Sequence, residues 1–345
     1  MRTLGMMIAV VVLMSGLIGC AGTGWKEGTA QQPPKPPPEQ KKFDAWMGTW
    51  SYEGEGRDSP LGPAGKFTGK CIGRPILNGF FFELRLEEKD WQSVQIHWYD
   101  AGAKTYRHIG FQSDGRVVAG TGTWNGVAWS AAWTTVHRGV EYRGRSQIIL
   151  AADGKSITNP GELSVDGKTW MPFCESKWTK ISDVPAAPPD FYASKPKPEM
   201  NPLEVLLGTW KAEEEVEATP LGPAGKYTTT ATNRWILDGF FSEGRITTDK
   251  NEHWLTICWY DPKGKCFQHR EFDDNGMAFS GTIAVDGNHW TGLFATTVNG
   301  VDYRFKYSTV VSDDKKTFTG KSVYSTDGKT WKSNSVVKHT KISEP

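Results

Sequence analysis

Two histidines at matching places in a repeated sequence are the side chains of this chain most able to do chemistry. His108 and His269 fall at equivalent positions of the two copies. A neutral imidazole near physiological pH can move a proton, and it can also ligate a metal such as haem iron. Each histidine follows a turn, at residues 100–104 in the first copy and 261–265 in the second. The turns therefore decide where each imidazole points.

The register of each hairpin follows from the residues that flank its turn. Pairing Asp100 with Lys104, and Asp261 with Lys265, predicts these opposite pairs: Trp98 with Tyr106, Ile96 with His108, Trp259 with Phe267, and Ile257 with His269. Alternate residues of a strand share a face. The pattern predicts both histidines on the ring-bearing face, inside the fold.

Charged residues also recur in both copies. They are Glu83, Arg85 and Arg74 in the first copy, and Glu243, Arg245 and Arg234 in the second. If these side chains point inward, each copy holds a polar cluster among aromatic rings, as in a ligand pocket. If they point outward, they form cross-strand pairs, each contributing ~0.2–1 kcal/mol. Ionised groups avoid interiors unless they are paired, which favours the outward reading.

Cys71 and Cys174 could form a disulfide bond within the first copy. The second copy has Ala231 and Ser335 at these positions, so the two cysteines occur together or not at all. Export from the cytoplasm would permit the bond. Two free thiols are the equally open alternative.

Other site classes lack their signatures. The seven histidines show no short metal-ligand spacing, and no serine lies in a Gly-x-Ser-x-Gly turn. With 40 basic and 39 acidic residues the chain is nearly neutral, which gives no electrostatic attraction to nucleic acid. No metal or cofactor is expected, although haem or another small apolar ligand is compatible with an interior histidine.

The chain contains one domain twice. Residues 48–90 and 208–250 are identical at 21 of 43 positions. The identical stretches include the loop Pro-Leu-Gly-Pro-Ala-Gly-Lys, at 60–66 and again at 220–226. An unchanged loop fits either a lid over a binding site or a demanding backbone path.

The amino terminus predicts an exported lipoprotein. Arg2 precedes an apolar run that ends in Leu-Ile-Gly-Cys at residues 17–20. This stretch has the form of a signal peptide, and its last four residues resemble the bacterial lipobox, which implies cleavage before Cys20 and acylation of that residue. Acyl chains would anchor the protein in the lipid bilayer. Ala21 in place of Asp resembles outer-membrane sorting, with the protein facing the periplasm.

Turn residues recur about every twelve positions in each copy, with aromatic or β-branched runs between them. This spacing predicts consecutive antiparallel hairpins. About ten strands per copy would close into an up-and-down β-barrel, because an open meander leaves two bare edges. A short helical turn at 43–47 and at 203–207 would plug one end. The predicted all-β organisation is a signal peptide (1–19), an acylated cysteine with a Pro-rich tether (20–42), a first barrel (43–181), a Pro-rich linker (182–202) and a second barrel (203–345).

These motifs resemble known families. A Gly-x-Trp opening on the first strand of a plugged barrel is similar to the lipocalin and calycin superfamily. A closer resemblance is to the domain of unknown function 1579 family, through residues 207–210, 236–241, 259–261 and 325–331. The first copy matches at 48–50, 98–100 and 164–170, but has Met47 where Leu207 stands. The family has no agreed activity, so the resemblance implies a fold and no reaction.

Three function classes remain open from the sequence. The first is an envelope lipoprotein whose barrels bind a small apolar or amphipathic ligand, through the histidines, the charged residues above, Tyr106, Trp98 and Trp259. The second is a structural or interaction protein whose barrels are filled by their own side chains. The third, least favoured, is a barrel enzyme that uses an interior histidine with a carboxylate. Oligomeric state and protein partners do not follow from the sequence.

Overall fold

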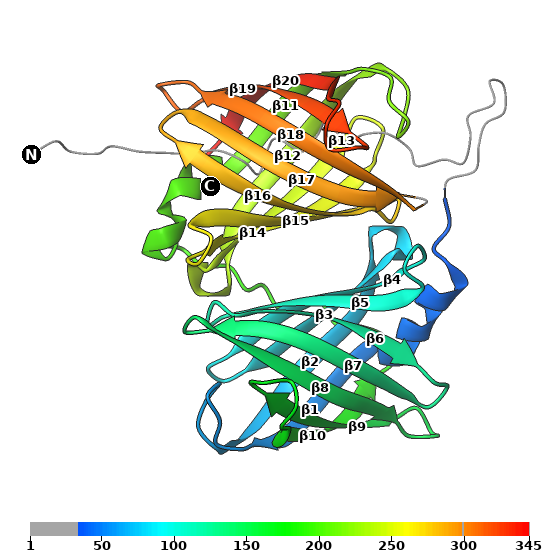
Figure 1. Cartoon of the computed structure of the whole chain (residues 1–345). Helices are drawn as coiled ribbons and strands as arrows, with labels where there is room; N and C mark the ends of the chain where they lie inside the picture. Colours follow the sequence, from blue (N-terminus) through cyan, green and yellow to red (C-terminus); the bar gives the residue numbers. More distant parts are fainter. Residues whose placement is uncertain (1–33, 299, 345) are drawn as a thin grey trace, which may run out of the picture. The chain divides into compact units, whose positions relative to one another are not determined.

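The regular turns of each copy produce a run of antiparallel hairpins that closes on itself. The computed structural model describes residues 34–298 and 300–344. One unit contains Pro36–Phe191 and the other begins at Tyr192. Each unit is a closed antiparallel barrel of ten strands (Figure 1), as predicted from the sequence. The last strand of each barrel pairs with the first, which leaves no strand edge bare.

The elements of the first barrel are η2 (Pro38–Trp46), β1 (Gly48–Gly56), β2 (Gly65–Ile76), η3 (Leu77–Gly79), β3 (Phe81–Glu88), β4 (Gln92–Asp100), β5 (Thr105–Gln112), β6 (Val117–Trp124), β7 (Ala128–His137), β8 (Val140–Leu150), β9 (Ser156–Ser164) and β10 (Met171–Ser182). Those of the second are η4 (Pro198–Leu206), β11 (Gly208–Val216), β12 (Gly225–Ile236), η5 (Leu237–Gly239), β13 (Phe241–Thr248), β14 (His253–Asp261), β15 (Cys266–Asp273), β16 (Ala278–Asp286), β17 (His289–Val298), β18 (Val301–Val311), β19 (Thr317–Ser325) and β20 (Lys332–Ser343). The two copies match element for element.

The predicted plugs are the 3₁₀ helices η2 and η4. Each begins with Pro at its first turn, which suits a position that needs no backbone donor. Trp50 Nε1 donates to the carbonyl oxygen of Trp46, 3.0 Å away, at the end of η2. Trp210 Nε1 donates to the carbonyl of Leu206, 2.8 Å away, at the end of η4. The Gly-x-Trp motif thus ties each plug to the first strand of its barrel.

The predicted hairpin register is wrong by one residue. Asp100 pairs with Thr105, and Asp261 with Cys266, because Lys104 and Lys265 stay in the loop with positive φ. A one-residue shift moves one strand's side chains to the opposite face relative to its partner. The observed pairs are Trp98 with Arg107, Tyr99 with Tyr106, His97 with His108, Trp259 with Gln268, and Cys258 with His269.

Several residues of the Pro-rich linker form hydrogen bonds with the barrels. Ala186 N donates to Thr49 Oγ1 at 3.0 Å, and Phe191 is buried in the first unit. In the second unit, Ala193 N donates to the carbonyl of Trp235 at 3.0 Å. The first part of the linker is therefore attached to the first barrel, and its last part to the second barrel, by hydrogen bonds.

The predicted signal peptide, Cys20 and most of the first tether lie outside the described residues. Lipidation at Cys20 and export therefore stay predictions. Within residues 34–298 and 300–344, no helix combines the length and apolarity needed to cross a bilayer.

Candidate functional site

The duplicated charged residues lie on the outer face of each barrel. Phe82 points inward, with its ring 5.8 Å from the plug residue Phe43, so its neighbour Glu83 points outward. Arg74 Nε and Arg85 Nε donate to Glu83, at 2.8 and 3.1 Å. These residues therefore form the outward alternative of the sequence analysis, and they do not line the interior.

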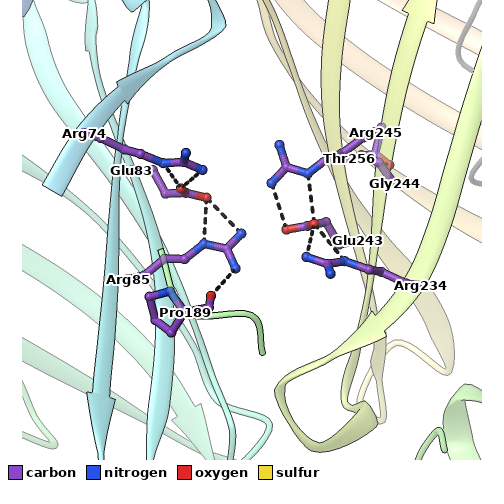
Figure 2. Close-up of polar contacts among 9 residues, drawn as sticks. All are labelled: Arg74, Glu83, Arg85, Pro189, Arg234, Glu243, Gly244, Arg245 and Thr256. Carbon is purple, nitrogen blue, oxygen red and sulfur yellow. Dashed lines mark hydrogen bonds and ion pairs between the residues drawn. The ribbon is translucent and has the colours of Figure 1, made fainter. Parts of the chain in front are cut away.

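The second barrel repeats this outer cluster. Arg234 Nη2 donates to Glu243 Oε1 at 3.0 Å, and Arg245 Nε donates to the same oxygen at 3.1 Å. Figure 2 shows the two arginines of each copy converging on one glutamate. Each glutamate side chain is buried between two guanidinium groups, an arrangement that satisfies a carboxylate in place. A role in ligand binding stays a prediction.

Trp98 and Trp259 also lie on the outer faces. Trp98 packs near Phe81, with ring centroids 6.0 Å apart, and Trp259 packs near Phe241 at 6.5 Å. The sequence placed both tryptophans on the same face as the histidines, and the register shift puts them on the opposite one. They flank the charged clusters instead.

Aromatic rings pack around the predicted His108 and Tyr106 inside the first barrel, where both of these side chains are partly buried. Phe43 of the plug stacks on Trp129 at 4.9 Å, and Tyr106 meets the same tryptophan edge-on at 4.2 Å. His97 and His108 stack with ring centroids 5.6 Å apart. Burial lowers the pKa of His108 to about 4, so this imidazole is neutral near pH 7.

The second barrel's interior carries a row of three polar side chains instead. Cys258 Sγ lies 2.8 Å from His269 Nδ1, across the β14–β15 pair. His269 Nε2 lies 3.5 Å from Glu271 Oε2, without forming a hydrogen bond. Burial raises the pKa of the Cys258 thiol. A protonated thiol can donate to Nδ1, which leaves the ring proton on Nε2, facing Glu271.

Many buried polar atoms of the second barrel have no hydrogen-bond partner within the protein. Among the described residues, fifteen such side-chain atoms belong to the second barrel and four to the first. The carboxyl, imidazole and hydroxyl groups in the second barrel's set are Glu214 Oε1 and Oε2, Glu271 Oε1 and Oε2, Asp273 Oδ2, His269 Nε2, His339 Nδ1 and Nε2, Tyr307 OH, Thr309 Oγ1 and Ser242 Oγ. Each unpaired buried polar group costs ~1–3 kcal/mol. Most buried polar groups of folded domains are bonded to other protein groups or to ordered water, so this concentration is high for protein partners alone.

The carboxyl groups of this interior are electrostatically coupled. Burial raises the pKa of Glu214 to about 8, although the Ser335 hydroxyl, close by but outside hydrogen-bond geometry, opposes the rise. Burial raises the pKa of Glu271 well above its ordinary value, and the charges of Asp273 and Glu214 raise it further. Burial also raises the pKa of Tyr307, with Glu271 and Glu214 adding to the effect. These groups form one cluster of mostly neutral hydrogen-bonding groups.

Aromatic rings border the cluster. Phe294 meets His269 edge-on at 5.4 Å and Tyr307 edge-on at 5.2 Å. Gly281 makes room for that ring, because a Cβ at this position would lie 2.0 Å from Phe294 Cδ1. The interior therefore combines apolar ring surfaces with polar groups, which is the composition of a site for an amphipathic molecule.

Most of this cluster was missed from the sequence because it is not duplicated. The first copy has Gly54, Gly110 and Ser146 where the second has Glu214, Glu271 and Tyr307. A search for polar residues present in both copies passes over such positions. A signal existed in β15, where alternate residues of one face are Phe267, His269, Glu271 and Asp273.

The predicted disulfide between Cys71 and Cys174 is contradicted, because both thiols are free. Cys71 pairs with Trp50 on one side of β1, and Cys174 pairs with Gly56 on the other. Six residues along a strand span ~20 Å. A disulfide requires Cα atoms within ~7 Å.

The unchanged loops close the same small turn in both copies. Ser59 N donates to the carbonyl of Gly62 at 3.0 Å, and Thr219 N donates to that of Gly222 at 2.8 Å. A shared backbone path thus accounts for the shared sequence, and a lid role stays a prediction. Within the described residues, no three His, Cys, Asp or Glu side chains gather in a way that could hold a metal ion.

Comparisons with known proteins do not identify the chain. No family model matches, so the resemblance to the domain of unknown function 1579 family stays a prediction. No curated protein matches either. A protein of unknown function from the DUF3598 family of Nostoc punctiforme is 12% identical and covers 89% of this chain and all of its own, with a TM-score of 0.29. Transferrin binding protein B from Haemophilus parasuis, as a mutant, is 10% identical and covers 85% of this chain and 75% of its own, with a TM-score of 0.20. At this level of similarity neither likeness indicates an activity.

The second barrel is expected to lose stability as the pH rises from 6.5 to 8. Folded Glu214 holds its proton up to about pH 8, whereas an exposed glutamate loses it near 4.5, so rising pH favours the unfolded chain. The slope is about 1.4 kcal/mol per pH unit for one such group. His269 and His339, whose pKa values fall to about 3, weaken the fold only below their ordinary 6.5.

Urea unfolding of the full chain at pH 6.5 and pH 8, with hydrogen exchange assigned to each barrel, measures this loss. The first barrel should not show it, because Gly54 stands where the second has Glu214. Glu214→Gln should reduce the slope of the second barrel by about 1.4 kcal/mol per pH unit, and Glu271, whose pKa is also raised, keeps the remainder. An unchanged slope in that variant would remove Glu214 as the cause.

Proposed function

We propose that the chain is an envelope lipoprotein whose second barrel binds a small amphipathic molecule. The observation that carries this proposal is the set of buried polar atoms without partners around Glu271, Glu214 and Tyr307. A ligand with hydrogen-bonding groups would satisfy them, and its apolar part would lie against rings such as Phe294. The acyl anchor at Cys20 and a periplasm-facing outer-membrane address belong to the proposal through the sequence.

A structural role is proposed for the first barrel. Its interior is occupied by the stacked rings of Phe43, Trp129 and Tyr106, and Tyr52 stacks on Trp178 at 4.9 Å. The rings of Phe43, Trp129 and Tyr106 thus pack against one another at the plug of this barrel. We therefore assign the hypothesis of a barrel packed with its own side chains to the first barrel, and the ligand-binding hypothesis to the second barrel.

Binding is favoured over catalysis for the row of Cys258, His269 and Glu271. A thiol beside an imidazole and a carboxyl has the order of a nucleophile, a base and an orienting group. A reactive cysteine needs a lowered pKa, whereas burial raises the pKa of this thiol. The row therefore serves better as a chain of hydrogen-bonding groups for a ligand.

Native mass spectrometry of the full chain, extracted from its host membrane in mild detergent, tests the proposal. We expect one small molecule bound per chain. His269→Phe should lose it, and the matched variant His108→Phe in the first barrel should keep it. A wild-type chain that carries no small molecule, or a loss that follows His108 instead, would refute the assignment. Acylation of Cys20 would be detected by mass spectrometry as the added mass of acyl chains on the mature amino-terminal peptide.

A further inference from the structure

A groove lies on the outer face of the second barrel, over strands β15 to β19. It has a volume of about 460 Å³, within the ~300–1,000 Å³ range of small-molecule sites. Tyr307 and Phe294 point inward and are buried, so their neighbours point outward, and Leu293 is 50% exposed. The outward side chains that line it include Thr282, Thr291, Leu293, Lys306, Lys321 and Val323. The groove thus joins an apolar wall to two cations.

Lys306 and Lys321 are neighbours on the outer face of the second barrel. Lys306 pairs with Val323 across β18 and β19, and Lys321 pairs with Ser308. They are therefore diagonal neighbours on one face, at ~7–8 Å between positions. Neither lysine forms an ion pair in the part of the chain that the structure describes. Lys306 Nζ lies 3.7 Å from the ring centre of Trp331, which holds its ammonium in place.

In the first copy, the cation at the corresponding place is paired with a carboxylate of the same barrel. Arg145, at the position of Lys306, donates to Glu162 at 2.6 Å. Its guanidinium lies 4.3 Å from the ring of Trp170, as Lys306 lies over Trp331. The stack is therefore common to both copies, whereas the internal ion pair is not.

Three substitutions between the copies change this surface in one direction. Val323 replaces Glu162 and removes the acid, Lys321 replaces Pro160 and adds a cation, and Leu293 replaces Ala132 and adds apolar surface. The three positions lie on β17 and β19, on either side of Lys306 in β18. Together they create a site with an apolar wall and an unbalanced positive charge.

We propose that this groove binds a free single-chain carboxylate, an apolar chain with one anionic head. The carboxylate lies between Lys306 and Lys321, where charge-assisted hydrogen bonds replace the missing Glu162 equivalent. The chain lies against Leu293 and Val323. A neutral or cationic head group gains nothing from the two ammonium groups.

The test uses the full chain with dodecanoate, and with dodecanol and dodecyltrimethylammonium as chains of equal length. The readout is the alkylation rate of Cys266, a groove residue, followed by peptide mass spectrometry. Dodecanoate should slow the alkylation, and the other two should not. The double variant K306Q/K321Q, and V323E, which restores the acid of the first copy, should each weaken dodecanoate about tenfold or more, or at least 1.4 kcal/mol.

Two further variants keep this proposal separate from the interior site. Glu271→Leu should leave the dodecanoate effect unchanged, so failure of one site does not entail failure of the other. The double variant E162V/P160K removes the acid that pairs with Arg145 in the first barrel and adds a cation beside it. We expect this variant to gain a second dodecanoate site, seen as a doubled binding stoichiometry in isothermal titration calorimetry. Equal protection by dodecanol, an effect insensitive to K306Q/K321Q, or no protection at all would overturn the proposal.

Discussion

Trp210→Ala is expected to cost the second barrel about 3–5 kcal/mol in free energy of unfolding, as for other buried tryptophans. The Trp210 side chain is fully buried and stacks on Phe318, with ring centroids 4.3 Å apart. Its Nε1 also holds the Leu206 carbonyl at the end of η4. Hydrogen exchange of the full chain should show faster exchange in η4, β11 and β20, with the first barrel unaffected.

The Trp→Phe pair separates ring packing from the hydrogen bond. Leu206 keeps a second donor, because Asn233 Nδ2 donates to the same carbonyl at 3.1 Å, whereas the first barrel has Gly73 at that position. Trp50→Phe should therefore cost more than Trp210→Phe, by about 1 kcal/mol for the unpaired carbonyl. Equal costs in the two barrels would contradict the role of Nε1 as the plug's anchor.

Glu271→Leu is expected to stabilise the second barrel by about 1–3 kcal/mol while it abolishes retention of the ligand. Both carboxyl oxygens of Glu271 are buried without hydrogen-bond partners, so the substitution removes a cost and breaks no hydrogen bond. A gain in stability coupled to loss of function is the mark of a binding residue. Urea unfolding and native mass spectrometry of the same preparation measure the two effects.

Tyr307→Phe is the companion variant to Glu271→Leu. Its hydroxyl is also buried without a partner, so we expect little change in stability and weaker ligand retention. A loss of more than about 1 kcal/mol in Glu271→Leu would mean that Glu271 stabilises the fold. In that case the polar interior would be structural, and the binding proposal would fail.

The barrel fold was predictable because local signals repeat along the chain. Turn residues at regular spacing set the hairpins, and Gly-Thr-Trp marked both the first strand and the plug. Register was less predictable, because it depends on one backbone torsion. Lys104 and Lys265 adopt positive φ, which lengthens each loop by one residue and moves Trp98 and Trp259 to the outer face.

The candidate site was only partly predictable. His108 and His269 were predicted as candidates because they occupy equivalent positions in the two copies. The structure places each imidazole inside its own barrel. Duplication then misled the search, because the repeated charges such as Glu83 lie outside, whereas Glu271 and Tyr307 occur in one copy. The disulfide prediction failed because Cys71 and Cys174 lie on strands separated by β1. Their joint replacement in the second copy gives no information about that distance.

Both proposals rest on divergence between the copies. Inside, Gly110 corresponds to Glu271, Gly54 to Glu214 and Ser146 to Tyr307, so the second barrel adds polar groups to its aromatic core. Outside, Glu162 corresponds to Val323, and an internal ion pair corresponds to a pair of free cations. Among the described residues, the second barrel has most of the buried polar atoms without a protein partner, and on its outer face Lys306 and Lys321 form no ion pair.

The most direct test of the central claim is a crystal structure of the full chain after gentle extraction, at a resolution that separates ligand from water. The account predicts density for an amphipathic molecule within hydrogen-bonding distance of Glu271 and Tyr307, and none inside the first barrel. A second barrel whose carboxyls and imidazoles are satisfied by side chains and ordered waters alone would contradict it.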